Sequence, residues 1–494
     1  RGDWKLHKAK CKRLTEIVVD TDVKNRLRSG ALKRQLLTLS EGTVILTIRD
    51  PDITTIGDMN LAVERAQFEA PFLVCKSLLR VDLKGCTKLT SVGSGAFWDC
   101  TSLTSVVLPD RLTQLGDSAF QDCTSLTSVV FPNSLTVLGE AAFVACSALT
   151  SVVLPNNLTQ IGLAAFLDCS SLTSVVLPDS LTMLGESAFG CTSLTSVLLP
   201  DSLTMLGNGA FGQCSSLTSV VFRDSLTQID NGAFSDCTSL TSVVLPDSLT
   251  ELGEQAFGGC SSLTSVVLPD SLTELVFAAF GRCTSLTSVV LPNSLTQLGK
   301  QAFQECTSLT SMVLPNSLTQ LSEAAFGGCT SLTSVVLPNS LTQVGFGAFS
   351  ECTSLTSVVL PDSLTQVGGA AFCECTSLTS VVMPDSAVLG DYVFEQCDAL
   401  LQKATFAGFD SVELYLRHRY ISITLRKLVL RLLGKYNRAV NNAEGTEAEK
   451  HASVLAQFPA DNSGSLDVGL FLKAMSASGG DGEKGLVGYI LKFV

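Results

Sequence analysis

Apolar and polar residues alternate in short, evenly spaced segments along most of the chain. In residues 103–108, Val106 and Leu108 are two positions apart, so a pleated strand turns both side chains to one face and turns Ser105 and Val107 to the other. The pattern predicts a short strand with an apolar inward face and a small, weakly polar outward face.

The residues that follow predict that each strand is part of a closed coil. Pro109 lacks a backbone N–H, so the strand ends and the chain turns a corner. We expect Leu112 and Leu115 to point inward, Gly116 to permit a second bend, and Ala119 to begin a short helical or 3₁₀ segment that buries a phenylalanine. One coil is too small to bury its own apolar face, so neighbouring coils must stack to make a core.

Cysteine marks the repeat, with a spacing of 23 residues apart from two steps of 22. The fourteen positions are Cys100, Cys123, Cys146, Cys169, Cys191, Cys214, Cys237, Cys260, Cys283, Cys306, Cys329, Cys352, Cys375 and Cys397. A fixed period of this length with this leucine spacing is typical of leucine-rich repeats. The Leu-Pro corner, the Leu-Gly step and the Ala-Phe-x-x-Cys segment resemble the BspA-like repeats, first known from bacterial surface antigens. The fold expected is an α/β solenoid, a right-handed coil with one long parallel sheet and helical segments at both ends.

The clean repeats occupy residues 100–400, and weaker copies precede them. Residues 44–48 and 53–57 reproduce the strand, the corner and the Leu-Gly step, and residues 79–97 supply another imperfect unit. We therefore assign residues 41–99 to degenerate N-terminal repeats.

Charge is distributed unevenly along the chain, whose net charge is −13. Residues 100–397 carry 4 basic and 24 acidic residues, or 4 − 24 = −20, whereas residues 1–40 carry 11 basic and 4 acidic ones, or +7. The acidic solenoid should repel nucleic acid and anionic lipid. No run of eighteen apolar residues occurs, so we predict no membrane span.

The cysteine column allows two interpretations. Neighbouring coils bring the positions within disulfide range, but the same slot between Phe and Leu in each coil suits a small buried apolar side chain, which favours free thiols. Cys373 lies outside the column and is the thiol expected to be most exposed.

The repeats give little support for catalysis and more for binding. Histidine is absent from residues 8 to 417, so a serine there lacks a general base, and we predict that the protein is not an enzyme. Two sets of residues are candidates for partner binding, although the first set also suits any strand and the second is compatible with neutral drift. They are the outward residues Val107, Val130, Val153, Val176, Val244, Val267 and Val290, and the apolar residues Leu163, Phe277 and Phe346 at a position that is usually polar.

A column of corner carboxylates raises the question of calcium. Asp179, Asp201, Asp224, Asp247 and Asp270 occupy one corner position in five successive coils. Asn fills the same position in other coils, so turn chemistry explains the column better than a calcium ladder does.

The N-terminal segment, residues 1–40, is basic and predicted to be helical. Within it, Trp4 and the pair His7 and Cys11 among lysines resemble the last part of a MYND zinc finger. The resemblance implies an intracellular protein, cytoplasmic or nuclear, whose finger binds short peptides. Two ligands do not complete a zinc site, so zinc is expected only if the rest of the finger precedes Arg1, and the chain that begins there is expected to be a fragment or a processed product.

After the last repeat, residues 401–440 predict a basic amphipathic helix that caps the solenoid, with Leu425, Leu428 and Leu432 on one stripe. Residues 441–494 predict a helical tail. The loop at 458–467 resembles a decayed EF-hand, but Pro459 and Leu470 occupy two ligand positions, so calcium binding should be poor.

These patterns predict a protein-binding scaffold or adaptor whose partner is a protein or peptide. A cell-surface adhesion or recognition solenoid is the alternative, distinguished by paired cysteines and an upstream signal peptide.

Overall fold

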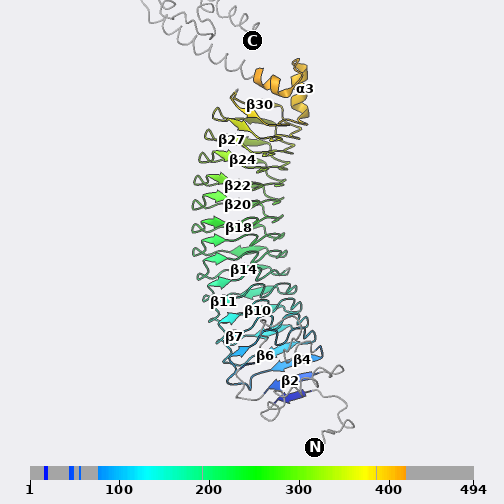
Figure 1. Ribbon diagram of the computed structural model, residues 1–494, viewed down its shortest axis with the longest axis vertical. Coiled ribbons are helices and arrows are strands. Elements are labelled where there is room, and N and C mark those ends of the chain that lie inside the picture. The colour runs from blue at the N-terminus through cyan, green and yellow to red at the C-terminus, as the bar shows by residue number, and fades with distance from the viewer. Residues whose placement is uncertain are drawn as a thin grey trace, which may run out of the picture. The chain divides into compact units, whose positions relative to one another are not determined.

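The computed structural model describes residues 16–19, 44–48, 55–56 and 76–418, apart from 192 and 385. The chain divides into two units, of which the first comprises residues 1–381 and 386–403 and the second comprises residues 382–385 and 404–494. The first unit is a parallel β-solenoid of about 13 turns with little helix (Figure 1). This confirms the solenoid that the repeat predicts.

Each regular coil contributes one strand to a main column, in which most neighbouring strands pair in parallel one repeat apart, as Val106 does with Val129. The main column contains β1 (Glu16–Val19), β2 (Val44–Ile48), β4 (Leu78–Asp82), β6 (Ser105–Val107), β8 (Ser128–Val130), β10 (Ser151–Val153), β12 (Ser174–Val176), β14 (Ser196–Leu198), β16 (Ser219–Val221), β18 (Ser242–Val244), β20 (Ser265–Val267), β22 (Ser288–Val290), β24 (Ser311–Val313), β26 (Ser334–Val336), β28 (Ser357–Val359) and β30 (Ser380–Val382).

A second column of two-residue strands follows the corner. It contains β3 (Thr55–Ile56), β5 (Ser91–Val92), β7 (Gln114–Leu115), β9 (Val137–Leu138), β11 (Gln160–Ile161), β13 (Met183–Leu184), β15 (Met205–Leu206), β17 (Gln228–Ile229), β19 (Glu251–Leu252), β21 (Glu274–Leu275), β23 (Gln297–Leu298), β25 (Gln320–Leu321), β27 (Gln343–Val344), β29 (Gln366–Val367) and β31 (Val388–Leu389). The expected fold did not include this second column, which forms because the Thr-x-Leu step is also extended and pairs with its equivalents.

The weaker N-terminal copies belong to the same columns. Strand β2 pairs with β4, with an irregularity between Val44 and Ile45, and β3 pairs with β5. Strand β1 pairs with β2 at residues where a helical segment was predicted. The run Ile17-Val18-Val19 explains the difference, since β-branched residues favour strands.

The segment between the Gly step and the column cysteine, residues 116–123 in one coil, is a series of turns and not the predicted helix. We call it the turn segment. The N–H groups of Ser118, Phe120 and Asp122 donate to carbonyls of the next coil at 2.7 to 2.8 Å, and the N–H groups between them bond within the coil. Ser118 and Asp122 adopt left-handed φ angles of 54° and 59°. Because alternate N–H groups point to the neighbouring coil, helical bonding cannot form.

Stacked phenylalanine rings run through the core beside the cysteines. From Phe97 to Phe394, each ring lies nearly parallel to the ring of the next coil; Phe257 and Phe280, for example, have centroids 5.5 Å apart and planes 3° apart. These rings are buried, as are the leucines that flank them. The core is therefore continuous, and every coil shares its apolar contacts with two neighbours.

The Gly step packs one coil closely against another. A Cβ on Gly116 would lie 2.6 Å from the backbone nitrogen of Ser94 in the preceding coil, so glycine is needed there for close approach as well as for the bend. The position equivalent to Gly116 alternates between larger residues and glycine in the coils from residue 230 to residue 345. The sequence of positions is Asp230, Gly253, Val276, Gly299, Ser322 and Gly345. Each of the three larger residues thus lies between two coils that carry glycine.

Helix α3 (Asp398–Phe406) follows the last column cysteine. In the first unit, the N–H of Ala399 donates to Thr376 O at 3.4 Å and Lys403 Nζ donates to Thr379 O at 3.1 Å, so the start of α3 is bonded to the last coils. In the second unit, residues 412–418 are helical, and the Phe409 ring lies 5.8 Å from that of Tyr415. The stripe at Leu425 and the EF-hand-like loop lie outside the described residues.

Candidate binding surface

The main strand column presents a flat outward face, as the alternation predicts. In β18, Ser242 and Val244 are exposed while Val243 between them is buried. Of the predicted valines, Val130, Val153, Val176, Val244, Val267 and Val290 are exposed and Val107 is half-buried. Leu198, Val221, Val313, Val336 and Val359 extend the same exposed column. We call this surface, with its adjacent Ser and Thr columns, the neutral face.

The neutral face carries very little charge although the solenoid is strongly acidic. Each coil between residues 101 and 384 contains a segment of nine residues that directly follows the column cysteine. Across all of these nine-residue segments there is one charged side chain, Arg223. The charges of the repeats therefore lie on the other faces. Covering an uncharged surface of small hydroxyl and methyl groups costs little desolvation energy, whereas covering unpaired carboxylates costs much more.

Threonine hydroxyls fasten the coils along this face. Thr127 Oγ1 donates to the Thr104 carbonyl at 3.3 Å, and Thr287 Oγ1 donates to the Thr264 carbonyl at 3.1 Å. The same bond recurs along the column. The hydroxyl hydrogens are therefore used internally, and the face is held in one geometry before any partner arrives.

The cysteine column is buried in the core. Fifteen of the described cysteines are buried, as predicted for the column, and none of the described cysteines forms a disulfide. Cys329 Sγ donates to the Phe303 carbonyl at 3.2 Å. Burial raises the pKa of Cys329 to about 12, from 9.0, against a smaller lowering by a backbone hydrogen bond. At neutral pH these thiols are protonated, and they act as core residues rather than nucleophiles.

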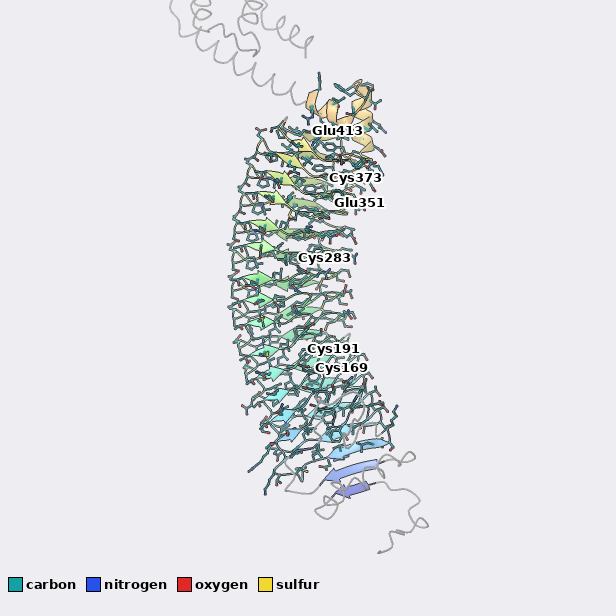
Figure 2. The ribbon with its side chains drawn as sticks, viewed as in Figure 1. Cys169, Cys191, Cys283, Glu351, Cys373 and Glu413 are labelled. Carbon is teal, nitrogen blue, oxygen red and sulfur yellow. The ribbon has the colours of Figure 1, made fainter. Side chains whose placement is uncertain are left out.

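Cys373 is the described cysteine that is partly exposed, as predicted. It lies on the edge of the solenoid next to the coil of Glu351 (Figure 2). Partial burial raises its pKa, and Glu374, Glu395 and Glu351 raise it further by repelling the thiolate. The site lacks the cationic environment that activates a cysteine.

The three apolar deviations do not form one patch. Leu163, Phe277 and Phe346 are all exposed and occupy one column of the turn segment. Leu163 and Phe277 are five coils apart, and Phe277 and Phe346 are three coils apart, or about 24 Å and 14 Å for strands spaced ~4.8 Å apart. One small partner cannot contact all three.

The corner aspartates are exposed, and Asp201 Oδ1 pairs with Arg223 Nε at 3.3 Å. Within the described ranges, three or more metal-ligating side chains do not gather anywhere in a geometry that would hold an ion. The predicted zinc ligands His7 and Cys11 lie outside those ranges. None of the described helices has the length and apolar character needed to cross a membrane.

A family model described as "BspA type Leucine rich repeat region" matches residues 70–192, 183–306 and 277–401, in six copies. The chain belongs to this family. Its solenoid is similar to a leucine-rich repeat protein from Bacteroides ovatus, with 28% identity and a TM-score of 0.57 over 73% of this chain and 90% of that one. A leucine-rich cell surface protein from Faecalibacterium prausnitzii is 26% identical over 67% of this chain and 82% of its own, with a TM-score of 0.40. No curated protein matches the chain.

Sequence reasoning missed one hollow in this BspA-type solenoid. It lies on the turn segments around Gly258, Gly259 and Gly281, and its volume is about 340 Å³. The available signal was the pair of glycines at Gly258 and Gly281 in adjacent coils, where the flanking coils carry Ser235 and Gln304.

Proposed function

We propose that this protein is a non-catalytic scaffold that binds a protein or peptide partner through the neutral face. The observation that supports the proposal is the single charged residue, Arg223, on a face that extends through the coils of residues 101–384 in an otherwise acidic solenoid. Large exposed surfaces with apolar character are typical of interaction sites, and a rigid face loses little entropy on binding.

The proposal includes an intracellular location and an adaptor architecture. Free cysteines such as Cys283 and Cys306 suit a reducing compartment. The resemblance of the segment with His7 and Cys11 to the end of a MYND finger supports an adaptor with a zinc-binding head. Zinc content and free-thiol count of a longer chain, extended upstream of Arg1, test this part. Bound zinc with free repeat thiols supports it, and no zinc with paired thiols contradicts it in favour of a cell-surface solenoid.

The neutral face is tested by adding charge to it. Val221→Glu, Val244→Glu and Val267→Glu together place three carboxylates on adjacent coils of exposed valines. The matched control is Gln297→Glu, Gln320→Glu and Gln343→Glu in the second column, where Glu251 and Glu274 already occur. Both variants gain the same charge and should keep the same Tm.

Partners are identified by chemical cross-linking and affinity capture from native extract, and each is then measured against the purified chain. We expect the neutral-face variant to lose the partner and the control variant to retain it. Equal retention by both variants, or equal loss from both, contradicts the proposal.

A further inference from the structure

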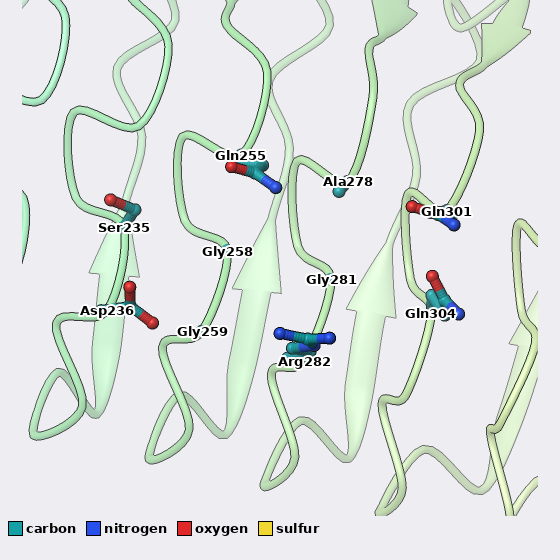
Figure 3. Close-up of a pocket in the computed structure, with 10 residues that line it drawn as sticks. All are labelled: Ser235, Asp236, Gln255, Gly258, Gly259, Ala278, Gly281, Arg282, Gln301 and Gln304. Carbon is teal, nitrogen blue, oxygen red and sulfur yellow. The ribbon is translucent and has the colours of Figure 1, made fainter.

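The turn segments of four successive coils form a polar trough. Gly258 and Gly281 make its floor, where the flanking coils carry Ser235 and Gln304 (Figure 3). Gln255 and Gln301 stand along one side and Asp236 and Arg282 along the other, as Figure 3 shows. The volume of about 340 Å³ is at the lower end of the range for small-molecule sites, about 300 to 1,000 Å³.

The glycines leave this space open because no neighbour fills it. At Gly190, elsewhere in the column, the Leu167 side chain covers the gap, and a Cβ there would lie 2.4 Å from Leu167 Cδ1. At Gly258 and Gly281, a Cβ would have its nearest neighbour at 3.2 Å, in Gln255 and Ala278 respectively. The floor therefore consists of backbone without side chains, with Gly258 half-buried and Gly281 buried.

The backbone of the trough is fully engaged and rigid. Gly259 N–H donates to Gly281 O at 2.8 Å, and Arg282 N–H donates to Gln304 O at 2.7 Å. The residues on both sides, including Gln255 and Arg282, are held at left-handed φ angles of 53° and 61°. Recognition must therefore come from side chains, and these project from a fixed backbone.

The side chains around the trough offer both hydrogen-bond donors and acceptors. In the part of the chain that the structure describes, no hydrogen bond engages the side-chain amides of Gln255, Gln301 and Gln304. Each amide can donate and accept, Asp236 accepts, and Arg282 donates. Glu305 lies 3.4 Å from Arg282 Nε and balances part of its charge. This site favours a neutral ligand with many hydroxyl groups over a strongly charged one.

The lining also disfavours an apolar peptide anchor, because Ala278 is its largest apolar side chain. We propose that the trough binds one pyranose unit of a neutral saccharide, independently of the neutral face.

The experiment uses the full chain and methyl glycosides of glucose, galactose, mannose and N-acetylglucosamine, followed by saturation-transfer NMR and titration. Gly281→Gln should fill the trough, because the equivalent position in the next coil is Gln304. Gly327→Gln is the matched control, since it makes the same change two coils further along the same column, where the nearest neighbour of a Cβ is Ser350 Oγ at 3.2 Å.

We expect at least one glycoside to bind, Gly281→Gln to weaken binding about tenfold or more, equivalent to about 1.4 kcal/mol, and Gly327→Gln to leave it unchanged. Equal Tm values of the two variants establish that both are folded. The proposal is overturned if none of the four glycosides binds, if binding survives Gly281→Gln, or if both variants lose binding equally.

Discussion

The thiol of Cys283 donates a hydrogen bond to the carbonyl oxygen of Phe257 in the preceding coil, with Sγ and O 3.2 Å apart. The same contact links Cys260 to Phe234 and Cys306 to Phe280. Each of these coils thus buries a thiol S–H group in the core, and the S–H group donates its hydrogen bond to a carbonyl of the preceding coil. Burial raises the pKa of Cys283 to about 12, so the thiol keeps its proton in the folded chain.

This raised pKa predicts that the solenoid loses stability in alkali. In the unfolded chain the thiol ionises near its ordinary pKa of 9.0, so the stabilisation is complete below pH 9 and is lost as the pH rises toward 12. Urea unfolding at pH 7.5 and pH 10 measures the effect. Other groups also ionise in alkali, so the contribution of Cys283 is isolated by comparing the free energy of unfolding of the wild type with that of Cys283→Ala. The difference between these two free energies should narrow by about 1.4 kcal/mol per pH unit above 9, and a constant difference would contradict the assignment.

The Gly step predicts a strong contrast between two glycines. In Gly299→Ala, the new Cβ would lie 2.5 Å from the carbonyl carbon of Val276, so a coil must shift. In Gly327→Ala, the nearest neighbour of the new Cβ is a serine hydroxyl at 3.2 Å, and the nearest backbone atom is Gly347 O at 3.4 Å. We expect the first change to lower the free energy of unfolding by ~2 kcal/mol or more and the second by less than ~1 kcal/mol. Similar losses for both would show that close approach does not explain the glycine.

The alternation in β18 predicts opposite results at adjacent valines. Val243 is 6% exposed and Val244 is 82% exposed. Val243→Thr buries a hydroxyl and should cost about 1 to 3 kcal/mol, whereas Val244→Thr should change stability by less than ~0.5 kcal/mol. Urea unfolding of the two variants at pH 7 provides the measurement. The assigned faces of the strand are wrong if Val244→Thr is the more damaging change.

Alkylation should separate Cys373 from the column. Iodoacetamide should modify Cys373 before buried thiols such as Cys352 and Cys375, because only Cys373 among these is partly exposed. Its raised pKa makes the reaction slow at pH 7 and faster toward pH 9, as the thiolate fraction increases. Peptide mass spectrometry follows each site separately. Modification of the column at a similar rate in the folded chain would contradict the burial described above.

The parts of the structure that follow from one coil alone were predictable. Strand position, the direction of Val243 and Val244, and the burial of the cysteines all depend on spacing within a repeat. The turn segment was not predictable in the same way, because its hydrogen bonds join Ser118 and Phe120 to the next coil and cannot be seen in one unit.

The second strand column was missed for a related reason. Two residues such as Gln114 and Leu115 are too few to show a period along the sequence, and only stacking makes them a strand. The trough was missed because it depends on absent side chains in adjacent coils, at Gly258 and Gly281. Features built between repeats must be sought by aligning units, not by scanning along the chain.

The alternation of larger residues and glycine between Asp230 and Gly345 limits how the array can grow or shrink. Loss of a single repeat, such as 277–299, would bring Val276 directly against Ser322, where each now faces a glycine. Loss of two repeats, 2 × 23 = 46 residues, would keep a glycine next to each larger residue at the Gly step. In this part of the chain the unit that recombination can add or remove without harm is a pair of coils, so the length of the neutral face should vary among relatives in steps of two.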